Sequence, residues 1–422
     1  MEGLNKVIGY NSVKKELLKV LDMLNNKEEY EKLGIKTPRG MLLYGVPGVG
    51  KTLIANAFIE ESNRNVIVCS KSKVTDNFAN YIRESFNEAC KRAPSIILLD
   101  DMDKFSNEDS NKCDSEEYVT NQSCIDDKKE FDVFVVATAN NISKLPYSLR
   151  RKGRFDLELE IRPPKGNESS EIIKHYLNSK QFEINVDIDF IVKVMDGKSC
   201  AVLESVINRA AQNALVAKRK IIEKEDVIEA CLNILYSSIE VDHHRPKENI
   251  ERVAYHEAGH VLVSEILKRD SIVLVSIKNF DSIYGGITSF YQDDSYWASI
   301  SNRYDRIVSL LGGMAATMYK FKERDSGALS DLERVYKIAI NLVTRNLVSS
   351  FDLYDVEESN YSNSNISLYK QNKVYSKIIE KCYRKALMII KKNSKLLDNL
   401  TKSLLEKEVL ISSDIKTIIE GR

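Results

Sequence analysis

The stretch MLLYGVPGVGKT, residues 41–52, decides the fold of the first half of the chain. Its first four residues are mostly apolar, as in a buried strand, and GVPGVGKT then fits the phosphate-binding pattern G-x-x-x-x-G-K-[ST]. The glycines let backbone N–H groups surround a phosphate, and the helix predicted from LIANAFIEE points its positive end at the anion. Lys51 reaches the β- and γ-phosphate oxygens, and Thr52 offers its hydroxyl to Mg²⁺. The predicted nucleotide loop consists of Gly45, Val46, Pro47, Gly48, Val49, Gly50, Lys51, Thr52 and Leu53.

Two further apolar segments end in polar residues that suit this loop. SIILLDDMD, residues 95–103, runs into Asp100, an expected Mg²⁺ ligand, and Asp101, where an acid can orient the attacking water. VVATANN, residues 135–141, puts Asn140 just after a strand, within reach of the γ-phosphate or its water. Short apolar runs between helices predict a parallel sheet covered on both faces. The sequence therefore predicts an α/β domain that binds ATP and Mg²⁺.

Three arginines follow in LRRKGRFD, residues 149–156. On one interpretation Arg150, Arg151 and Arg154 are solvated surface charges. On the other they are offered to the nucleotide of a neighbouring subunit, because arginine fingers can act in trans. The motifs that precede them favour the second interpretation.

The composition is that of a globular protein with two or three domains. The chain has 422 residues and a formal net charge of zero, so no basic field favours nucleic acid. Its seven cysteines never form C-x-x-C, which indicates a reducing compartment and no thiolate metal site. The most apolar window, residues 307–319, is shorter than the roughly 20 residues of a spanning helix, and no signal peptide is evident. We expect a cytoplasmic protein, or alternatively the cytoplasmic part of a membrane-anchored parent or a peripheral membrane protein.

Shifts in composition divide the chain. A polar, proline-containing segment, DHHRPKEN, indicates a linker, and SIVLVSIKNF with YGGITSFYQ indicates a β-hairpin in the second half. Residues 106–117 and 352–367 are polar and are expected to be surface loops. The predicted domains are an α/β domain at 1–166, a segment of helices only at 167–240, a linker at 241–249 and a mostly helical domain at 250–422.

AYHEAGHVL, residues 254–262, carries a second kind of chemistry. On a helix, His256 and His260 lie one turn apart on the same face, so both can hold one ion. Glu257 can then take a proton from zinc-bound water, whose pKa the metal lowers to about 7. The pattern H-E-x-x-H is typical of zinc proteases. The alternative is a buried helix with two structural histidines.

A catalytic zinc site needs a third protein ligand. The longer metzincin pattern requires a histidine at position 266, and Ile266 excludes that class. Spacing alone does not choose among the downstream carboxylates, which include Glu265, Asp270, Asp305, Glu323, Asp325 and Asp331.

The order GVPGVGKT, SIILLDD, ATANN, RRKGRFD and then HEAGH resembles the FtsH-type ATP-dependent zinc metalloproteases, from Val7 to the C-terminus. The resemblance implies an AAA+ domain with a helical lid at 167–240, then a mostly helical zinc peptidase domain. It also implies Zn²⁺, ATP and Mg²⁺ as cofactors, a homohexameric ring, and unfolded or tagged proteins as substrates.

The resemblance also assigns residues. By motif position, Val7 and Ile8 lie near the adenine, Asn140 is the nucleotide sensor, and Arg151 and Arg154 are the trans arginines. SGALSDLERVYKIA, residues 326–339, is similar to the segment that carries the third zinc ligand, which matches Asp331. In that helix Leu329, Leu332, Val335 and Ala339 are expected to face the core. GGITSF resembles the strand that pairs with extended substrate, which implies contacts from Gly286, Ile287 and Thr288.

The sequence departs from the family in several places, mostly in the ATPase half. The family's N-terminal transmembrane anchor is not seen. Asp101 replaces a glutamate, which predicts slower ATP hydrolysis. KVTDNFAN, residues 73–80, is shorter than the family's aromatic pore loop and leaves Phe78 as the gripping residue. Cys200 replaces a glycine in the lid, and Tyr176 replaces a histidine beside the adenine.

Three functions follow. The first is a ring-forming, ATP-dependent zinc endopeptidase. The second is a remodelling ATPase that unfolds clients without cutting them. The third is a zinc peptidase whose weak ATPase only holds the ring together. The acidic residues that the family has in the segment LGGMAATM, residues 311–318, are also replaced, but the departures cluster in the ATPase half and the metal motif is intact. Peptidase chemistry is therefore the central prediction.

Overall fold

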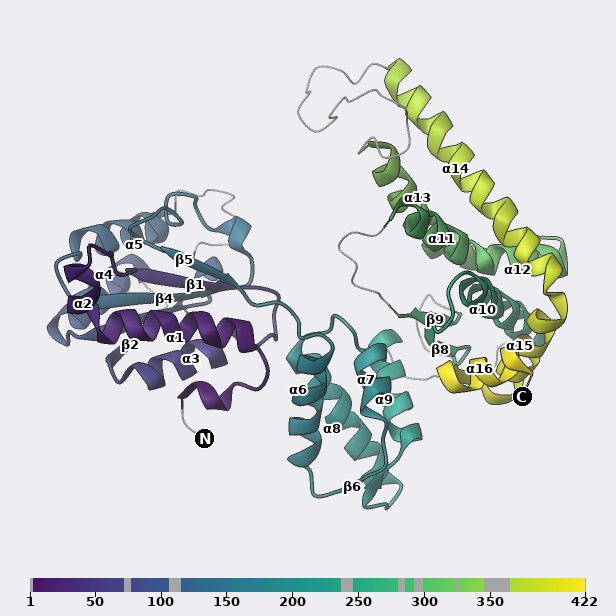
Figure 1. Cartoon of the computed structure of the whole chain (residues 1–422), viewed down its shortest axis with the longest axis horizontal. Helices are drawn as coiled ribbons and strands as arrows, with labels where there is room; N and C mark the ends of the chain where they lie inside the picture. Colours follow the sequence, from purple (N-terminus) through teal and green to yellow (C-terminus); the bar gives the residue numbers. More distant parts are fainter. Residues whose placement is uncertain are drawn as a thin grey trace. The chain divides into compact units, whose positions relative to one another are not determined.

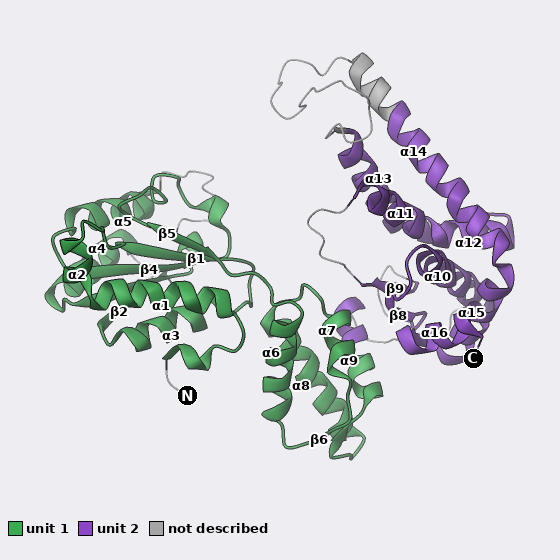
Figure 2. Cartoon of the chain, viewed as in Figure 1, with its two compact units in different colours: residues 1–230 green, residues 231–422 purple. Residues whose placement is uncertain are grey.

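The computed structural model divides the chain into two compact units, Met1–Ala230 and Cys231–Arg422 (Figure 2). It describes residues 3–71, 77–105, 115–236, 246–279, 285–291, 299–323, 326–344 and 365–421, with side chains from 373 onward in the last range. The predicted surface loops at 106–117 and 352–367 lie largely outside these ranges. Their described ends, residues 116–117 and 365–367, begin helices instead.

The first unit contains the predicted parallel sheet. Five strands lie in the order β2-β3-β4-β1-β5, and each neighbouring pair is parallel (Figure 1). Phe58 of α3 packs against Phe134 on one face of the sheet, while α4 and α5 bury Phe86 and Tyr118 on the other. The strands are β1 (Gly40–Tyr44), β2 (Asn65–Ser70), β3 (Ser95–Asp100), β4 (Val133–Ala139) and β5 (Leu157–Glu160). The helices are α1 (Asn11–Asn25), α2 (Lys27–Lys32), α3 (Lys51–Ser62), α4 (Phe78–Lys91) and α5 (Glu116–Asp127).

A helical segment completes the first unit, and α9 runs across the boundary between the units. Its helices are α6 (Asn167–Asn178), α7 (Ile188–Val194), α8 (Cys200–Val216) and α9 (Lys224–Tyr236). The prediction of helices alone is wrong in one detail, because β6 (Glu183–Ile184) and β7 (Ile221–Ile222) form a short parallel pair. Each strand is two residues long, too short for alternation to be visible in the sequence.

The second unit is mostly helical and contains the predicted β-hairpin of β8 (Ile272–Ser276) and β9 (Ile287–Phe290). A third strand, β10 (Val409–Ile411), pairs antiparallel with β8 and was not predicted, because three apolar residues between helices carry no strand signal. The sheet order β10-β8-β9 leaves β9 at an edge. The helices are α10 (Lys247–Leu267), α11 (Ile300–Leu310), α12 (Gly312–Phe321), α13 (Leu329–Thr344), α14 (Asn365–Lys392), α15 (Ser394–Lys407) and α16 (Ser412–Glu420).

Two sequence predictions for this unit need correction. Helix α10 begins at Lys247, inside the predicted linker, whose residues 241–245 lie outside the described ranges. In α13, Val335 and Ala339 are fully buried and Leu332 packs on the core, as expected, but Leu329 is 65% exposed. Leu329 is the first residue of the helix, so the core-facing stripe starts one turn later.

Helices α10 and α12 cross in backbone contact at Gly259 and Gly312. A Cβ built on Gly259 would lie 2.4 Å from the carbonyl oxygen of Gly312, and one on Gly312 would lie 2.6 Å from that of Gly259. Real Cβ atoms do not approach that closely, so neither position accepts a side chain without separating the helices. Around this crossing lies the core of the unit, which includes Val261, Leu262 and Ala316.

Across the described part of the chain, every helix is either too short or too polar to span a bilayer.

Replacing Gly259 by alanine tests the crossing. In an ordinary helix this change stabilises by roughly 0.5–1 kcal/mol, but here the new Cβ must displace α12. We expect a loss of about 1–3 kcal/mol in the free energy of unfolding, measured by urea titration. Asn341→Ala, at an exposed position of α13, should change stability by less than about 0.5 kcal/mol. A gain in stability for Gly259→Ala would contradict the crossing.

Candidate metal centre and nucleotide site

Three ligand atoms from two helices meet at one point in the second unit. The Nε2 atoms of His256 and His260, both in α10, lie 3.0 Å apart. The Oδ2 atom of Asp331, in the first turn of α13, lies 3.1 Å from the first and 3.0 Å from the second. Within the described ranges this is the one cluster of histidine, cysteine or carboxylate groups with the spacing of a metal site.

The donor set fits zinc. The Nδ1 atom of His260 lies 2.9 Å from the carbonyl oxygen of Ser309, and since a carbonyl only accepts, Nδ1 carries the proton. In its neutral form, His260 therefore has its lone pair on Nε2, which points at the cluster. Two imidazole nitrogens and one carboxylate oxygen form a standard catalytic zinc set, which leaves further coordination positions open.

Gly313 gives the ligands their room. A Cβ on Gly313 would lie 2.5 Å from Nε2 of His256 and 2.6 Å from Nε2 of His260. Any side chain at this position would fill the space toward which both ligand atoms point. Gly313, in the segment LGGMAATM of residues 311–318, is therefore part of the site, although no pattern in the sequence pointed to it directly.

The electrostatics of the cluster follow from burial and charge. Burial lowers the pKa of His260, but the charge and hydrogen bond of Asp331 outweigh it and raise that pKa to about 9. Burial raises the pKa of Asp331, and the two histidines outweigh it and hold the pKa well below its usual range. Without a metal, the site therefore holds an imidazolium beside a carboxylate.

Glu257 lies beside the metal ligands and against the edge strand. It is buried, and its Oε2 atom accepts a hydrogen bond of 2.6 Å from the hydroxyl of Thr288 in β9. A Cβ on Gly286 would lie 2.7 Å from the other oxygen, Oε1. Thr288 thus fixes one oxygen, and the glycine keeps space beside the other.

The remaining carboxylate candidates for the third ligand have other partners. Glu265 accepts hydrogen bonds from the backbone N–H groups of residues 270–272, which joins α10 to β8. Asp305 pairs with Lys385 at 2.8 Å, and Glu323 pairs with Arg252 at 3.0 Å. Asp270 does not join the cluster, and Asp325 lies outside the described residues. Of the described candidates, Asp331 is the one that meets both histidines.

The predicted nucleotide residues meet at the carboxyl edge of the parallel sheet. The Lys51 ammonium is buried and donates to the carbonyl oxygens of Gly45 and Val46 and to Oδ1 of Asn140, at 2.8, 3.1 and 2.8 Å. Burial lowers its pKa. The Thr52 hydroxyl lies 3.2 Å from Oδ1 of Asp100. Side chains from the loop and from the ends of β3 and β4 are therefore already assembled around the space for a phosphate.

Acidic residues after β3 hold Asn140 in place. The Asn140 amide donates to Oδ1 of Asp101 at 3.3 Å, and its backbone N–H donates to Oδ1 of Asp103 at 3.0 Å. Asp101 also forms an ion pair of 2.6 Å with Lys104. Sequence reasoning missed Asp103, although it is the third acid of DDMD and its position after the strand was the available sign.

Helix α8 packs against the phosphate loop, and the N-terminal segment contacts α8. Ala201 N–H donates to the carbonyl oxygen of Gly48 at 3.0 Å, and the Cys200 thiol lies 3.7 Å from that of Val49. The Tyr10 hydroxyl lies 3.3 Å from the Cys200 sulfur. Val7 is buried and Ile8 half-buried just before Tyr10. Burial raises the pKa of Tyr176, which is half-buried in α6, to about 12. The contact of Val7, Ile8 or Tyr176 with adenine remains a prediction.

The arginines differ in their partners. Arg150 pairs with Glu158 at 2.8 Å, and Arg154 pairs with Asp126 at 2.7 Å. Arg151 is exposed, and its guanidinium lies 5.7 Å from the ring centre of Tyr147. Of the two arginines that were predicted to act in trans, Arg151 is therefore exposed, whereas Arg154 is held by Asp126.

Phe78 is not available as a gripping residue in this structure. Its side chain is 8% exposed, and its ring packs edge-on against Phe105 at 4.8 Å. It begins α4 and belongs to the core, which does not support the prediction of Phe78 as the gripping residue of the pore loop. Residues 72–76 of the predicted pore loop lie outside the described ranges.

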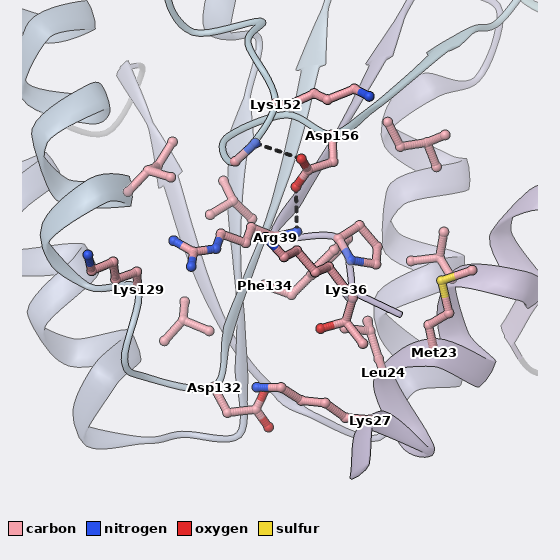
Figure 3. Close-up of a pocket in the computed structure, with 18 of the residues that line it drawn as sticks. Met23, Leu24, Lys27, Lys36, Arg39, Lys129, Asp132, Phe134, Lys152 and Asp156 are labelled. Atoms are coloured by element: carbon pink, nitrogen blue, oxygen red, sulfur yellow. Dashed lines mark hydrogen bonds between the residues drawn. The ribbon is translucent and has the colours of Figure 1, made fainter. Parts of the chain in front are cut away.

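A large cavity in the first unit lies away from the predicted nucleotide residues. It has a volume of about 1260 Å³ and lies at the amino ends of β1, β4 and β5, where Asp156 accepts from the backbone N–H groups of Arg39 and Gly153 (Figure 3). Both basic and acidic side chains line it, among them Lys129 and Asp132 (Figure 3). The predicted nucleotide residues lie at the carboxyl ends of the strands, whereas this cavity lies at their amino ends. The cavity is therefore not the nucleotide site.

Comparisons with known proteins agree with the two halves of the chain. The sequence model of the ATPase family associated with various cellular activities (AAA) matches residues 41–163, and that of peptidase family M41 matches residues 244–418. The chain is similar to the ATP-dependent zinc metalloprotease FtsH 2 of Thermoanaerobacter sp., with 30% identity over 98% of this chain and 82% of the relative. It is also similar to FtsH of Karelsulcia muelleri, with 31% identity over 98% of this chain and 70% of the relative. It is 32% identical to FtsH 2 of Phytoplasma mali and spans 62% of that relative's length.

The proton on His260 gives a test of the metal site. Zinc requires a neutral imidazole, so zinc binding to the metal-free protein must release this proton at any pH below about 9. We expect the apparent zinc affinity to fall about tenfold for each pH unit between 8 and 6. Calorimetry in two buffers of different ionisation enthalpy measures the released protons. Asp331→Asn should bind zinc more weakly and release fewer protons at pH 7, and a pH-independent affinity in the unsubstituted chain would contradict the assignment.

Asp101 gives a test of the nucleotide site. Its carboxylate is shorter by one methylene than the glutamate of the family and is engaged by Lys104 and Asn140. We expect Asp101→Glu to raise the ATPase rate by roughly tenfold, because positioning errors of about an ångström slow hydrolysis strongly. Asp103→Glu is the matched control and should give no gain, because Asp103 holds backbone N–H groups. Equal rates for Asp101→Glu and the unsubstituted chain would show that residue 101 does not limit hydrolysis.

Proposed function

Because the chain belongs to the FtsH family of ATP-dependent zinc metalloproteases, we propose that it unfolds protein substrates with ATP and cuts them at a zinc site. The observation that carries the proposal is the meeting of His256, His260 and Asp331 beside the buried Glu257. The AAA half supplies a second site in which Lys51 contacts Asn140 and Thr52 contacts Asp100. The cofactors are Zn²⁺ at the first site and ATP with Mg²⁺ at the second.

The chain's own residues divide the work of peptide hydrolysis. His256, His260 and Asp331 would hold zinc, and zinc bound at such a site supplies an acidified water and polarises the peptide carbonyl. Glu257 accepts the water's proton and passes it to the leaving amine. Thr288 holds the Oε2 atom of Glu257 by a hydrogen bond. The other oxygen, Oε1, beside Gly286, is therefore the one that accepts and releases the proton.

The edge strand β9 supports the binding of extended substrate. One side of β9 pairs with β8, and no other described strand pairs with its second side. Strand addition uses main-chain hydrogen bonds and therefore accepts many sequences. We propose that Gly286, Ile287 and Thr288 line the bound peptide and that Thr288 joins this strand to Glu257.

We further propose that the working assembly is a homohexameric ring in which Arg151 and Arg154 reach the nucleotide of the next subunit. The exposure of Arg151 supports this role. We place the ring in the cytoplasm or on the cytoplasmic side of a membrane, because none of the described cysteines forms a disulfide. Unfolded or tagged proteins are the proposed substrates.

Glu257→Gln separates the two activities. We expect casein cleavage to fall at least about a hundredfold, because the proton acceptor is lost, while ATPase rate and zinc content stay unchanged. Glu251→Gln, on the same helix and half-buried, is the matched control and should cut casein normally.

The same assay distinguishes the alternatives when it is run with and without ATP and with a chelator. If the protein unfolds its substrate without cutting it, and the chelator leaves ATP hydrolysis unchanged, the result would favour a remodelling ATPase. If the chelator abolishes cleavage, and the cleavage rate is the same with and without ATP, the result would favour a peptidase with a weak ATPase. Loss of both activities in Glu257→Gln would contradict the division of work.

A further inference from the structure

Arg306 of α11 lies beside the metal centre and has no role in the proposed mechanism. Its guanidinium carbon is 3.9 Å from the ring centre of Phe290, the last residue of β9. The Phe290 ring in turn lies 6.2 Å from the His260 ring, at an angle of 77°. Arg306 is thus separated from a metal ligand by a single aromatic ring and lies at the end of the proposed substrate strand.

Other contacts place Arg306 on the side of α11 that faces the site. Ser309, one turn later on α11, accepts the hydrogen bond that orients His260. The negative charge of Asp331, the predicted third zinc ligand, acts to raise the pKa of Arg306. Burial, with a smaller contribution from Arg334, lowers the pKa of Arg306 to about 10, and Asp331 opposes that change. The guanidinium still carries its charge at neutral pH.

This charge lacks a carboxylate partner among the described residues. Arg64, Arg219 and Arg252 each form an ion pair of 3.0 Å or less, whereas Arg306 contacts the face of Phe290. The nearest acid that acts on it, Asp331, is already bound to two histidines. A half-buried guanidinium is costly to leave without an anion, and its planar fork matches a carboxylate in particular.

We propose that Arg306 binds a carboxylate of the peptide substrate and so gives the protease a preference for acidic sequence next to the cut bond. The inference rests on the proposed peptidase function. The carboxylate comes either from an aspartate or glutamate side chain near the Phe290 end of β9 or from the C-terminus of a short peptide. In either case, stacking on the Phe290 ring fixes the plane of the guanidinium. Its N–H groups can then bind both oxygens of the substrate carboxylate.

A purely structural role makes a different prediction. If Arg306 only packs on Phe290, removing its charge changes all peptides alike. If it binds a carboxylate, removing its charge changes acidic peptides alone. The ratio of rates between acidic and neutral peptides therefore separates the two roles, even if the variant is somewhat less stable.

The test uses the full chain with zinc and ATP. Blocked fluorogenic decapeptides carry glutamine at every position flanking the cut, and glutamate then replaces one glutamine at a time. A second pair differs in a free or amidated C-terminus. Arg306→Met and Arg306→Lys are compared with Arg303→Met, a half-buried arginine on the same helix. Binding of fluorescein-labelled glutamate and glutamine peptides to Glu257→Gln, with and without Arg306→Met, is followed by anisotropy.

We expect kcat/KM to favour glutamate over glutamine by about tenfold at one position, or the free C-terminus by a similar factor. Arg306→Met should remove this preference, so that glutamate and glutamine peptides are cut with the same kcat/KM. Arg306→Lys should keep part of the preference, and Arg303→Met should keep all of it. The anisotropy titrations should show the same ratios of affinity.

Absence of any acidic preference in the unsubstituted chain, or its persistence in Arg306→Met, would overturn the inference. A chain that cuts no peptide would contradict the proposed function instead. In that case the anisotropy arm still decides on Arg306, because it requires binding and no cleavage.

Discussion

Everything in the second unit depends on three lone-pair atoms being held about 3 Å apart inside folded protein. Two come from one turn of α10, and the third comes from a helix that begins about seventy residues later. Three such groups repel one another or share a proton unless a cation lies among them. The fold supplies the force that holds them, because α10 crosses α12 in backbone contact and Ser309 of α11 fixes the ring of His260.

In both units the fold itself assembles the site, although the two sites carry out different chemistry. In the first, the ends of parallel strands bring Asp100 and Asn140 to the phosphate loop, and Lys51 bridges the loop to β4. In the second, a helix crossing and an edge strand bring a base to the metal ligands. In the second unit, Gly286 and Gly313 also leave space beside Glu257 and the metal ligands. The presence of both sites in one chain supports the proposed coupling of ATP hydrolysis to peptide cleavage.

Local motifs allowed much of this to be predicted from the sequence. The phosphate loop, the parallel sheet and the histidine pair each lie within a few consecutive residues, so their geometry follows from helix and strand periodicity. Asp331 is different, because spacing left several carboxylates open and only family resemblance selected it. The fold then brought it to the histidines. Gly313 and Arg306 were not predicted at all, because their role arises from neighbours far away in the sequence.

The errors have a similar cause. Phe78 was assigned by analogy to an exposed loop, yet packing against Phe105 buries it. Leu329 was placed on the core face by periodicity, which says nothing about where the stripe begins. The strand β10 is recognisable only through its partner β8.

The central claim is that two histidines and one aspartate bind a single zinc ion. X-ray absorption spectroscopy of the zinc-loaded protein tests it most directly. The account predicts one zinc per chain with two imidazole nitrogens and oxygen donors at about 2.0–2.2 Å. A sulfur neighbour at about 2.3 Å, or zinc bound in an outer sphere without imidazole scattering, would contradict it.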